Sequence, residues 1–323
     1  MKLWDLKQQF LKSVQDKGGF VNCHGHYDKA FYITQEGLNK TMVDMEMKWR
    51  MSDDLKRDSP EDQIADRIRE ALDIMIAQGS NLTSSFVDAY DAVGHKAINA
   101  ASQVQEEYKN KINFLTMTQP LGGLVDKEAR DLFEAISSKA NIVGGLPSKD
   151  RPNDELNWDL LFSIAKNLNK PLHVHVDQEN NPNEHDTEKL IHYTIKHGYE
   201  GRVVAIHAIS VSAQPKEYRK NIYQKLADTG IPVVICPSAA LSMRQLDQLV
   251  SPVHNSIANL AEMLEAGVLV GLGVDNIADF YQPFVDGDLW TEVRLLQEAC
   301  RYYDFENLTS IASENGRKIL GMI

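Results

Sequence analysis

Short apolar runs alternate with longer amphipathic segments along the whole chain. Eight runs rich in β-branched or apolar residues, bounded by polar and glycine positions, are typical of strands. They span residues 18–24, 81–87, 112–118, 140–146, 171–176, 202–207, 231–236 and 268–274. Because each parallel return between strands needs a long crossover, this alternation predicts a parallel sheet with helices packed outside it.

The segments between these runs carry helix start and stop signals. Ser59 is expected to cap a helix with Pro60 in its first turn, and the helical spacing continues until Gly79. The segments 215–230 and 256–267 similarly end in glycine just before the next strand. An amphipathic helix is also expected at about residues 1–17, before the first strand.

Eight strands that alternate with helices predict a closed (β/α)8 TIM barrel of the α/β class. We expect residues 1–323 to form this barrel as a single domain. An open doubly wound sheet is the alternative. That fold would bind a dinucleotide through a GxGxxG turn after the first strand, and the sequence has no such turn there.

Composition narrows the class of protein. The chain of 323 residues is 43% hydrophobic and carries a net charge of −12 without a block of basic residues, which argues against nucleic acid and anionic membranes as partners. No window has the length of a membrane span, and the N-terminus lacks the apolar core of a signal peptide. The three cysteines form no CxxC pair, which indicates reduced thiols and a cytoplasmic location.

Five metal-binding side chains lie at predicted strand ends. His24 and His26 follow the first strand, His175 and His207 end the fifth and sixth, and Asp275 follows the last. The active site of a (β/α)8 barrel lies at the carboxyl ends of its strands, so these residues are expected to meet at one mouth. Three imidazoles and a carboxylate suit one divalent ion, zinc first and iron second, with an open position for water. Such an ion would supply hydroxide near neutral pH.

The stretches HGHYDKAF, HVHVDQ, IHAIS and GVDNIADFYQPF resemble, in order, the metal motifs of the amidohydrolase superfamily in its cytosine-deaminase-like branch. The resemblance implies that His24, His26, His175 and Asp275 bind one metal ion, and that Asp275 also handles a proton. It implies that His207 polarises the substrate or the water. The predicted fourth strand contains no lysine that could bridge a second metal ion, and Lys149 beyond it is expected to be an exposed loop charge.

The same resemblance implies a substrate-binding set after three strands. Gln119 matches the glutamine that contacts the substrate ring in cytosine deaminase, while Asn276 and Tyr281 fall where the family places further substrate contacts. From their positions after strands, Lys29 and Arg151 are candidates for binding a substrate carboxylate.

One motif departs from the family pattern. The strand-5 motif HxxE, whose glutamate shuttles protons in these deaminases, is HxxQ here, with Gln178 in place of glutamate. A neutral amide cannot act as a general acid or base near pH 7. Either the substrate is an already cationic formimino or amidine compound, as in the N-formimino-L-glutamate deiminases that this motif resembles, or Asp177 or Glu179 takes the role. The second option is less favoured, since both are expected to point elsewhere as solvated loop charges.

The functional expectation is therefore a metal-dependent hydrolase of a non-peptide carbon–nitrogen bond in a small polar molecule, with deamination as the favoured subtype. Hydrolysis of a cyclic amide or of another leaving group on a nitrogen heterocycle is one alternative. A non-catalytic metal-binding protein is the other. The chain is also expected to lack the flanking β-sandwich of most relatives in this branch, and the exposed barrel surface would favour a homo-oligomer.

Overall fold

The computed structural model describes residues 5–43, 45–251 and 257–321. Eight parallel strands run in sequence order around a barrel. They are β1 (Val21–Asn22), β2 (Leu82–Asp88), β3 (Asn113–Gln119), β4 (Val143–Gly145), β5 (Leu172–Val176), β6 (Val203–His207), β7 (Val233–Ile235) and β8 (Val270–Leu272). All eight predicted strands are confirmed, each at its expected place.

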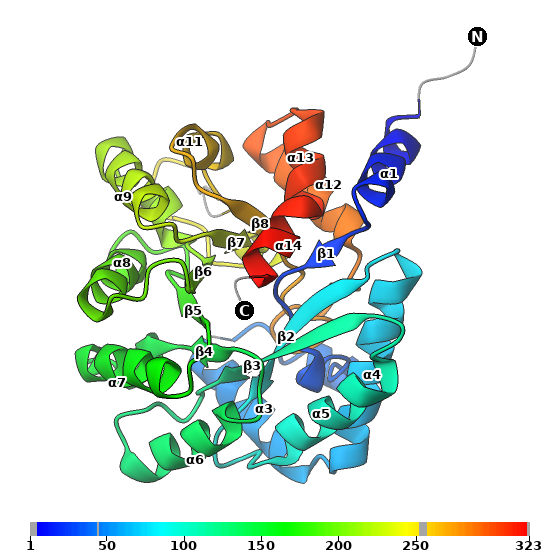
Figure 1. Ribbon diagram of the computed structural model, residues 1–323, viewed down its shortest axis with the longest axis vertical. Coiled ribbons are helices and arrows are strands. Elements are labelled where there is room, and N and C mark those ends of the chain that lie inside the picture. Colours follow the sequence, from blue (N-terminus) through cyan, green and yellow to red (C-terminus); the bar gives the residue numbers. More distant parts are fainter. Residues whose placement is uncertain (1–4, 44, 252–256, 322–323) are drawn as a thin grey trace.

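Two seams close the barrel. Strands β1 to β3 and β4 to β8 form two sheets, which are joined by a bridge between Met117 and Ile142 and by another between Gly25 and Asp275. At the second seam the Cys23 amide donates to the Leu272 carbonyl over 2.9 Å. The predicted (β/α)8 barrel is therefore confirmed, and Figure 1 shows its helices arranged around the strands.

The helices occupy the crossovers and the two ends of the barrel. They are α1 (Leu6–Asp16), α2 (Gln35–Leu38), α3 (Met45–Asp58), α4 (Glu61–Ala77), α5 (Lys96–Tyr108), α6 (Lys127–Ser137), α7 (Asp154–Asn167), α8 (Asp186–His197), α9 (Lys216–Asp228), α10 (Pro237–Leu241), α11 (Leu260–Glu265), α12 (Leu289–Cys300), α13 (Phe305–Ala312) and α14 (Glu314–Leu320). Three short 3₁₀ turns follow strands: η1 (Tyr27–Lys29), η2 (Pro147–Asp150) and η3 (Ser210–Ala213).

Two expected helix starts need correction. The N-cap of α4 is Pro60 and not Ser59, whose hydroxyl donates to the Leu55 carbonyl at the end of α3 instead. The expected helix 256–267 begins only at Leu260, and its predicted start at Ser256 lies outside the described residues. The predicted stop at Gly79 is confirmed, because this glycine takes a left-handed φ of +80° just after α4.

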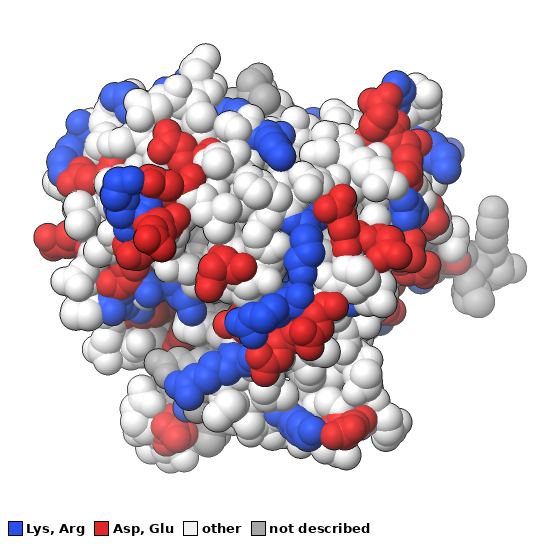
Figure 2. All heavy atoms as spheres, turned by 90° about the horizontal axis from the view of Figure 1, so that it is seen from below, with Lys and Arg blue, Asp and Glu red and all other residues white. Residues whose placement is uncertain are grey.

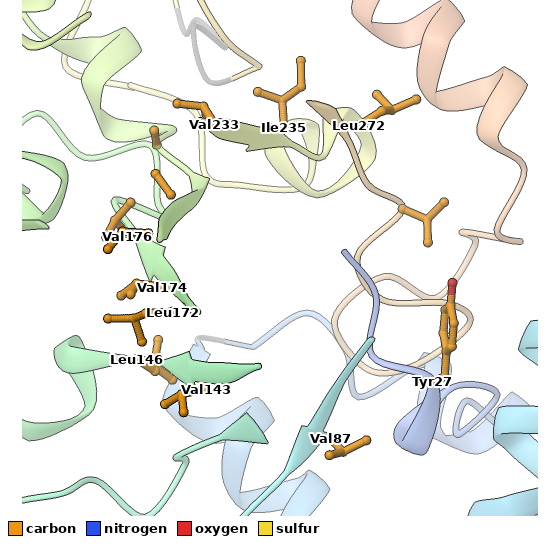
Figure 3. Close-up of a cluster of buried hydrophobic side chains, with 14 of the residues drawn as sticks. Tyr27, Val87, Val143, Leu146, Leu172, Val174, Val176, Val233, Ile235 and Leu272 are labelled. Carbon is orange, nitrogen blue, oxygen red and sulfur yellow. The ribbon is translucent and has the colours of Figure 1, made fainter. Parts of the chain in front are cut away.

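Alternation along the strands builds two apolar layers. Figure 3 shows Leu172, Val174 and Val176 of β5 pointing away from the barrel interior, and these side chains pack with the helices. A separate cluster fills the interior and includes Val204 and Ile206 of β6. The inward positions of β5 are His173 and His175, so the pleat that buries apolar residues outside directs imidazoles inside.

Charge is finely mixed on the outside. Figure 2 shows acidic and basic side chains lying beside one another on the face seen from below in Figure 1. No helix among the described residues combines the length and the apolarity that a membrane span needs.

Gly144 marks the tightest packing between neighbouring strands. A Cβ at this position would lie 1.8 Å from the Thr118 carbonyl oxygen and 2.3 Å from the Phe86 ring. We expect Gly144→Ala to lower the free energy of unfolding by about 3 kcal/mol, because strands β3 and β4 would have to separate. The midpoint of urea unfolding measures this loss.

Gly201→Ala is the matched control for this substitution. Gly201 has φ of +75° but open space around it, so alanine there should cost only about 1 kcal/mol from the left-handed backbone. Equal losses at the two glycines would contradict the packing argument.

Candidate active site

The predicted metal-binding side chains converge at one end of the barrel. The Asp275 Oδ1 atom lies 3.0 Å from His24 Nε2 and 3.1 Å from His26 Nε2. The His24 ring centroid lies 5.0 Å from that of His175 and 5.2 Å from that of His207. The structure thus brings together the five residues that the sequence placed at four strand ends.

The backbone at two strand ends departs from regular strand geometry to achieve this. Val203 and Ala205 of β6 face outward, so regular alternation would turn His207 outward as well. Instead His207 adopts a φ of +77°, and its ring lies 5.4 Å from that of His175 inside the barrel. Asp275 has a φ of +64°. Left-handed conformations of such residues cost about 1–3 kcal/mol each, which is typical of functional sites.

The floor of the site is tightly packed. The Phe86 ring lies 4.4 Å from the His175 ring and 5.1 Å from the His24 ring, between centroids. Gly273 faces His24 so closely that a Cβ there would lie 2.7 Å from the His24 Cβ. The imidazoles therefore have little freedom to change their relative positions.

The donor set fits a divalent metal ion. The ligand atoms of His24, His175 and His207, and those of His24, His26 and Asp275, all lie within 4.8 Å of one another in their respective triads. The Nδ1 atom of His175 lies 3.2 Å from the Gly145 carbonyl, and its buried Nε2 has no hydrogen-bond partner among the described residues. This arrangement fixes the tautomer that leaves the Nε2 lone pair free for a metal.

Burial lowers the pKa of His26, His175 and His207 and so keeps these three imidazoles neutral. It lowers the pKa of His26 to about 3, with the Lys29 charge as a second cause, and that of His207 to about 4. Burial opposes ionisation of Asp275, but hydrogen bonds with His24 and His26 outweigh it and hold the pKa of this carboxyl well below its usual value. Neutral imidazoles and an ionised carboxylate are the forms that bind metals.

Gln282 is a site residue that sequence reasoning missed. Its Nε2 donates to the second oxygen of Asp275 over 3.0 Å. The residue lies within the quoted stretch GVDNIADFYQPF, but its spacing after the strand gave no sign of this contact. The two oxygens of Asp275 are thus oriented separately, one toward the imidazoles and one toward an amide.

A cavity of about 710 Å³ opens above the cluster. The predicted substrate-binding residues Gln119, Asn276 and Tyr281 all line it, as do Gln178 and four of the five cluster residues, His26, His175, His207 and Asp275. Lys48 and Trp49 of α3 form part of its wall, as do Met243 and Arg244, which follow α10. The site is therefore covered by segments inserted after β1 and β7.

The neighbours of Gln178 differ from expectation. Asp177 is buried and accepts hydrogen bonds from the Asp186 and Thr187 amides over 2.7 and 3.0 Å, so it caps the start of α8 instead of lying in solvent. Burial raises the pKa of Asp177 to about 7. Glu179 is exposed, as expected, but it also lines the cavity. Asp177 is thus engaged outside the site, whereas Glu179 borders it.

The two candidates for binding a substrate carboxylate are engaged with protein carboxylates. Lys29 lies 3.0 Å from buried Asp88, and Arg151 lies 2.9 Å from Glu184 and 2.6 Å from Asp186. Lys149 is partly buried over the Trp49 ring and is not the exposed charge that was expected.

Comparison with known proteins places this architecture in a family. Residues 18–323 match the model of the amidohydrolase family. The chain belongs to this family. It is 37% identical over 266 residues to an uncharacterized protein of Haemophilus influenzae, covering 80% of this chain and 95% of that protein.

One curated relative and one solved structure also resemble the chain over most of its length. The chain is 28% identical to N-isopropylammelide isopropyl amidohydrolase of Pseudomonas sp., over 84% of this chain and 65% of that protein. The structure of 5-methylcytosine deaminase from Klebsiella pneumoniae liganded with 5-fluorocytosine superposes with a TM-score of 0.86 at 20% identity, over 94% of this chain and 75% of that one. The expected enzyme class is confirmed: a hydrolase of carbon–nitrogen bonds other than peptide bonds, in a metal-dependent family.

Glu292 is a buried carboxyl beside the cavity wall. It lies on α12 and accepts hydrogen bonds from the backbone amide, over 2.9 Å, and from the hydroxyl of Ser238 at the start of α10. Burial raises the pKa of Glu292 to about 8, although the Ser238 hydrogen bonds oppose this. The folded protein therefore holds this proton at pH values where the unfolded chain has lost it.

This raised pKa predicts a pH-dependent loss of stability. Between the unfolded pKa of about 4.5 and the folded pKa of about 8, stability should fall as pH rises, because the folded state binds the extra proton. Glu292→Gln should therefore lose less stability between pH 5 and pH 8 than the parent, as measured by thermal unfolding. Glu298→Gln, at an exposed position of the same helix, is the control, and an unchanged pH slope in Glu292→Gln would contradict the prediction.

Proposed function

We propose that this protein is a deaminase-type aminohydrolase that removes an exocyclic amino group from a small nitrogen heterocycle, with one divalent metal ion, zinc first and iron second. The observation that carries the proposal is the convergence of four imidazoles and Asp275 on the floor of one polar cavity. The substrate-binding candidates Gln119, Asn276 and Tyr281 line the same cavity.

His24, His26, His175 and Asp275 are the proposed ligands, with His207 beside them. A bound divalent ion would lower the pKa of a water molecule and so provide a nucleophile near neutral pH. Strand β4 carries no lysine, which supports a single ion. The remaining chemistry then falls to the side chains of the chain itself.

Asp275 is the proposed proton carrier. It takes one proton from the attacking water and passes it to the departing nitrogen, while the oxygen and the other hydrogen stay on the ring carbon, so that the carbon–nitrogen bond breaks and ammonia leaves. His207 hydrogen-bonds the polarised substrate. Gln178 can orient the substrate by hydrogen bonds but cannot exchange a proton.

Two observations support a heterocycle over an acyclic formimino acid. Lys29 and Arg151, the candidates for a substrate carboxylate, are both occupied by protein carboxylates. The named relatives act on or bind nitrogen rings, since one is an N-isopropylammelide hydrolase and the other holds 5-fluorocytosine. The second candidate function is release of an alkylamine in place of ammonia, which the similarity to N-isopropylammelide isopropyl amidohydrolase favours.

The proposal predicts amine release that depends on the metal cluster. The purified protein should contain about one equivalent of zinc or iron and release ammonia from at least one member of a panel of aminopyrimidines, aminotriazines, aminopurines and formimino compounds. Asp275→Asn should lose at least about 10³-fold in rate, because the substitution removes both a proposed metal ligand and the proposed proton carrier. Full metal content without ammonia or amine release from any compound would support a non-catalytic metal-binding protein instead.

Gln178→Glu tests what the departure from HxxE does. A carboxylate at this place restores a proton shuttle, so deamination of cytosine should rise by about tenfold or more, measured as kcat/KM. Glu179→Gln is the matched variant one position along, where the parent already has a carboxylate lining the cavity. Loss of activity in Glu179→Gln would assign the proton transfer to Glu179 and contradict the role given to Asp275.

A further inference from the structure

The amide of Gln119 has a fixed orientation. Its Oε1 atom lies 2.8 Å from the Lys29 ammonium, and the side chain is only 6% exposed, against the cavity. An ammonium group has three donors and no acceptor, so the Gln119 atom that faces it must be the oxygen. The NH2 group of Gln119 is therefore on the other side.

Lys29 is held in place by a buried charge cluster that sequence reasoning missed. Asp88 bridges two lysines, with one oxygen 3.0 Å from Lys29 Nζ and the other 2.7 Å from Lys56 Nζ. The Asp88 amide in turn donates to Asp28 over 2.9 Å. All four side chains are at least 96% buried. Two lysines and two aspartates balance in formal charge. The ion pair with Asp88 therefore holds the Lys29 ammonium in its buried position.

The Gln119 NH2 group has no hydrogen-bond partner among the described residues, and Gln119 lines the cavity. Lys29 also lines the cavity, and its ammonium group can donate hydrogen bonds but cannot accept them. The corner formed by Lys29 and Gln119 thus offers donors alone. A ligand group placed there has to be an acceptor, because a second donor would leave both groups unpaired.

Asn276 is fixed in the opposite sense. Its Nδ2 atom donates to Asp279, whose other oxygen accepts from the Tyr281 and Gln282 amides over 2.8 and 3.0 Å. The Asn276 oxygen is then the atom left for a ligand, and this residue lines the same cavity. One side chain of the cavity therefore presents a donor, and another presents an acceptor.

We propose that Lys29 is a specificity-determining positioning residue: by locking the Gln119 amide with its NH2 group toward the cavity, it selects heterocycles that place a ring carbonyl, and not an amino group, against this corner. This inference rests on the proposed function and names its substrate class. A neutral carbonyl fits better than a carboxylate, because the charges of the buried cluster are already balanced and a further anion would be desolvated without a partner.

The test uses ring pairs that differ in the group facing this corner. Pyrimidin-2(1H)-one offers the carbonyl and N–H, whereas 2-aminopyrimidine offers an amino group and a ring nitrogen. The corresponding 1,3,5-triazin-2(1H)-one and 2-amino-1,3,5-triazine form a second pair. Calorimetric titration of the metal-loaded protein should show the carbonyl compound binding about 10- to 100-fold more tightly in at least one pair.

Two variants test whether Lys29 and Gln119 recognise the ligand or only stabilise the fold. Gln119→Glu keeps an oxygen facing the Lys29 ammonium but replaces the NH2 group with a second oxygen, an acceptor, so the preference should reverse toward the amino compound. Lys29→Met releases the amide, which can then rotate, and the preference should shrink by about tenfold. Lys189→Met removes a lysine that pairs with Asp154 at the α7–α8 contact, away from the cavity, and should leave the preference unchanged.

Three results would overturn the inference. They are equal affinity for both members of each pair in the parent, an unreversed preference in Gln119→Glu, and binding of none of the four compounds. The ammonia-release panel then distinguishes the cases, since release from a compound without a ring carbonyl keeps the proposed function and rejects only the role of Lys29. Absence of release from every compound rejects both.

Discussion

The contact between the first and last strands is the interaction on which the rest of the structure depends. The backbone of Asp275 donates to the His24 carbonyl over 3.1 Å, and its carbonyl accepts from the His26 amide over 3.2 Å. The side chains of the same three residues meet at 3.0 and 3.1 Å. Closing the barrel and assembling the candidate metal centre are therefore one event, since the same residues do both.

This coupling explains where the fold tolerates unfavourable local structure. His207 and Asp275 hold left-handed backbone conformations, and several buried imidazole nitrogens lack partners within the described chain. Each is costly in isolation. The apolar layer outside the strands and the cluster inside them supply the compensating burial, which leaves the carboxyl ends of the strands free to carry polar groups.

Periodicity and strand-end reasoning predicted the architecture well, because both depend on local patterns. The eight strands and the convergence of His24, His26, His175, His207 and Asp275 follow from short apolar runs and from barrel geometry.

Contacts between distant segments were beyond such reasoning. Lys56 and Asp88 look like ordinary surface charges in sequence, since neither lies in a recognisable motif, and only the folded chain shows that they bury each other. The capping role of Asp177 was missed because its partners belong to the following helix, nine and ten residues away.

Helix α3 has two roles that are normally separate in this architecture. Lys48 and Trp49 form part of the cavity wall, while Lys56 of the same helix belongs to the buried charge cluster beneath Gln119. Loops at the carboxyl face of (β/α)8 barrels usually diversify independently of the scaffold. Here, replacing the segment between β1 and β2 would remove Lys56, the counter-ion of buried Asp88. New specificities should therefore arise by single substitutions along α3 and not by exchange of the whole insertion.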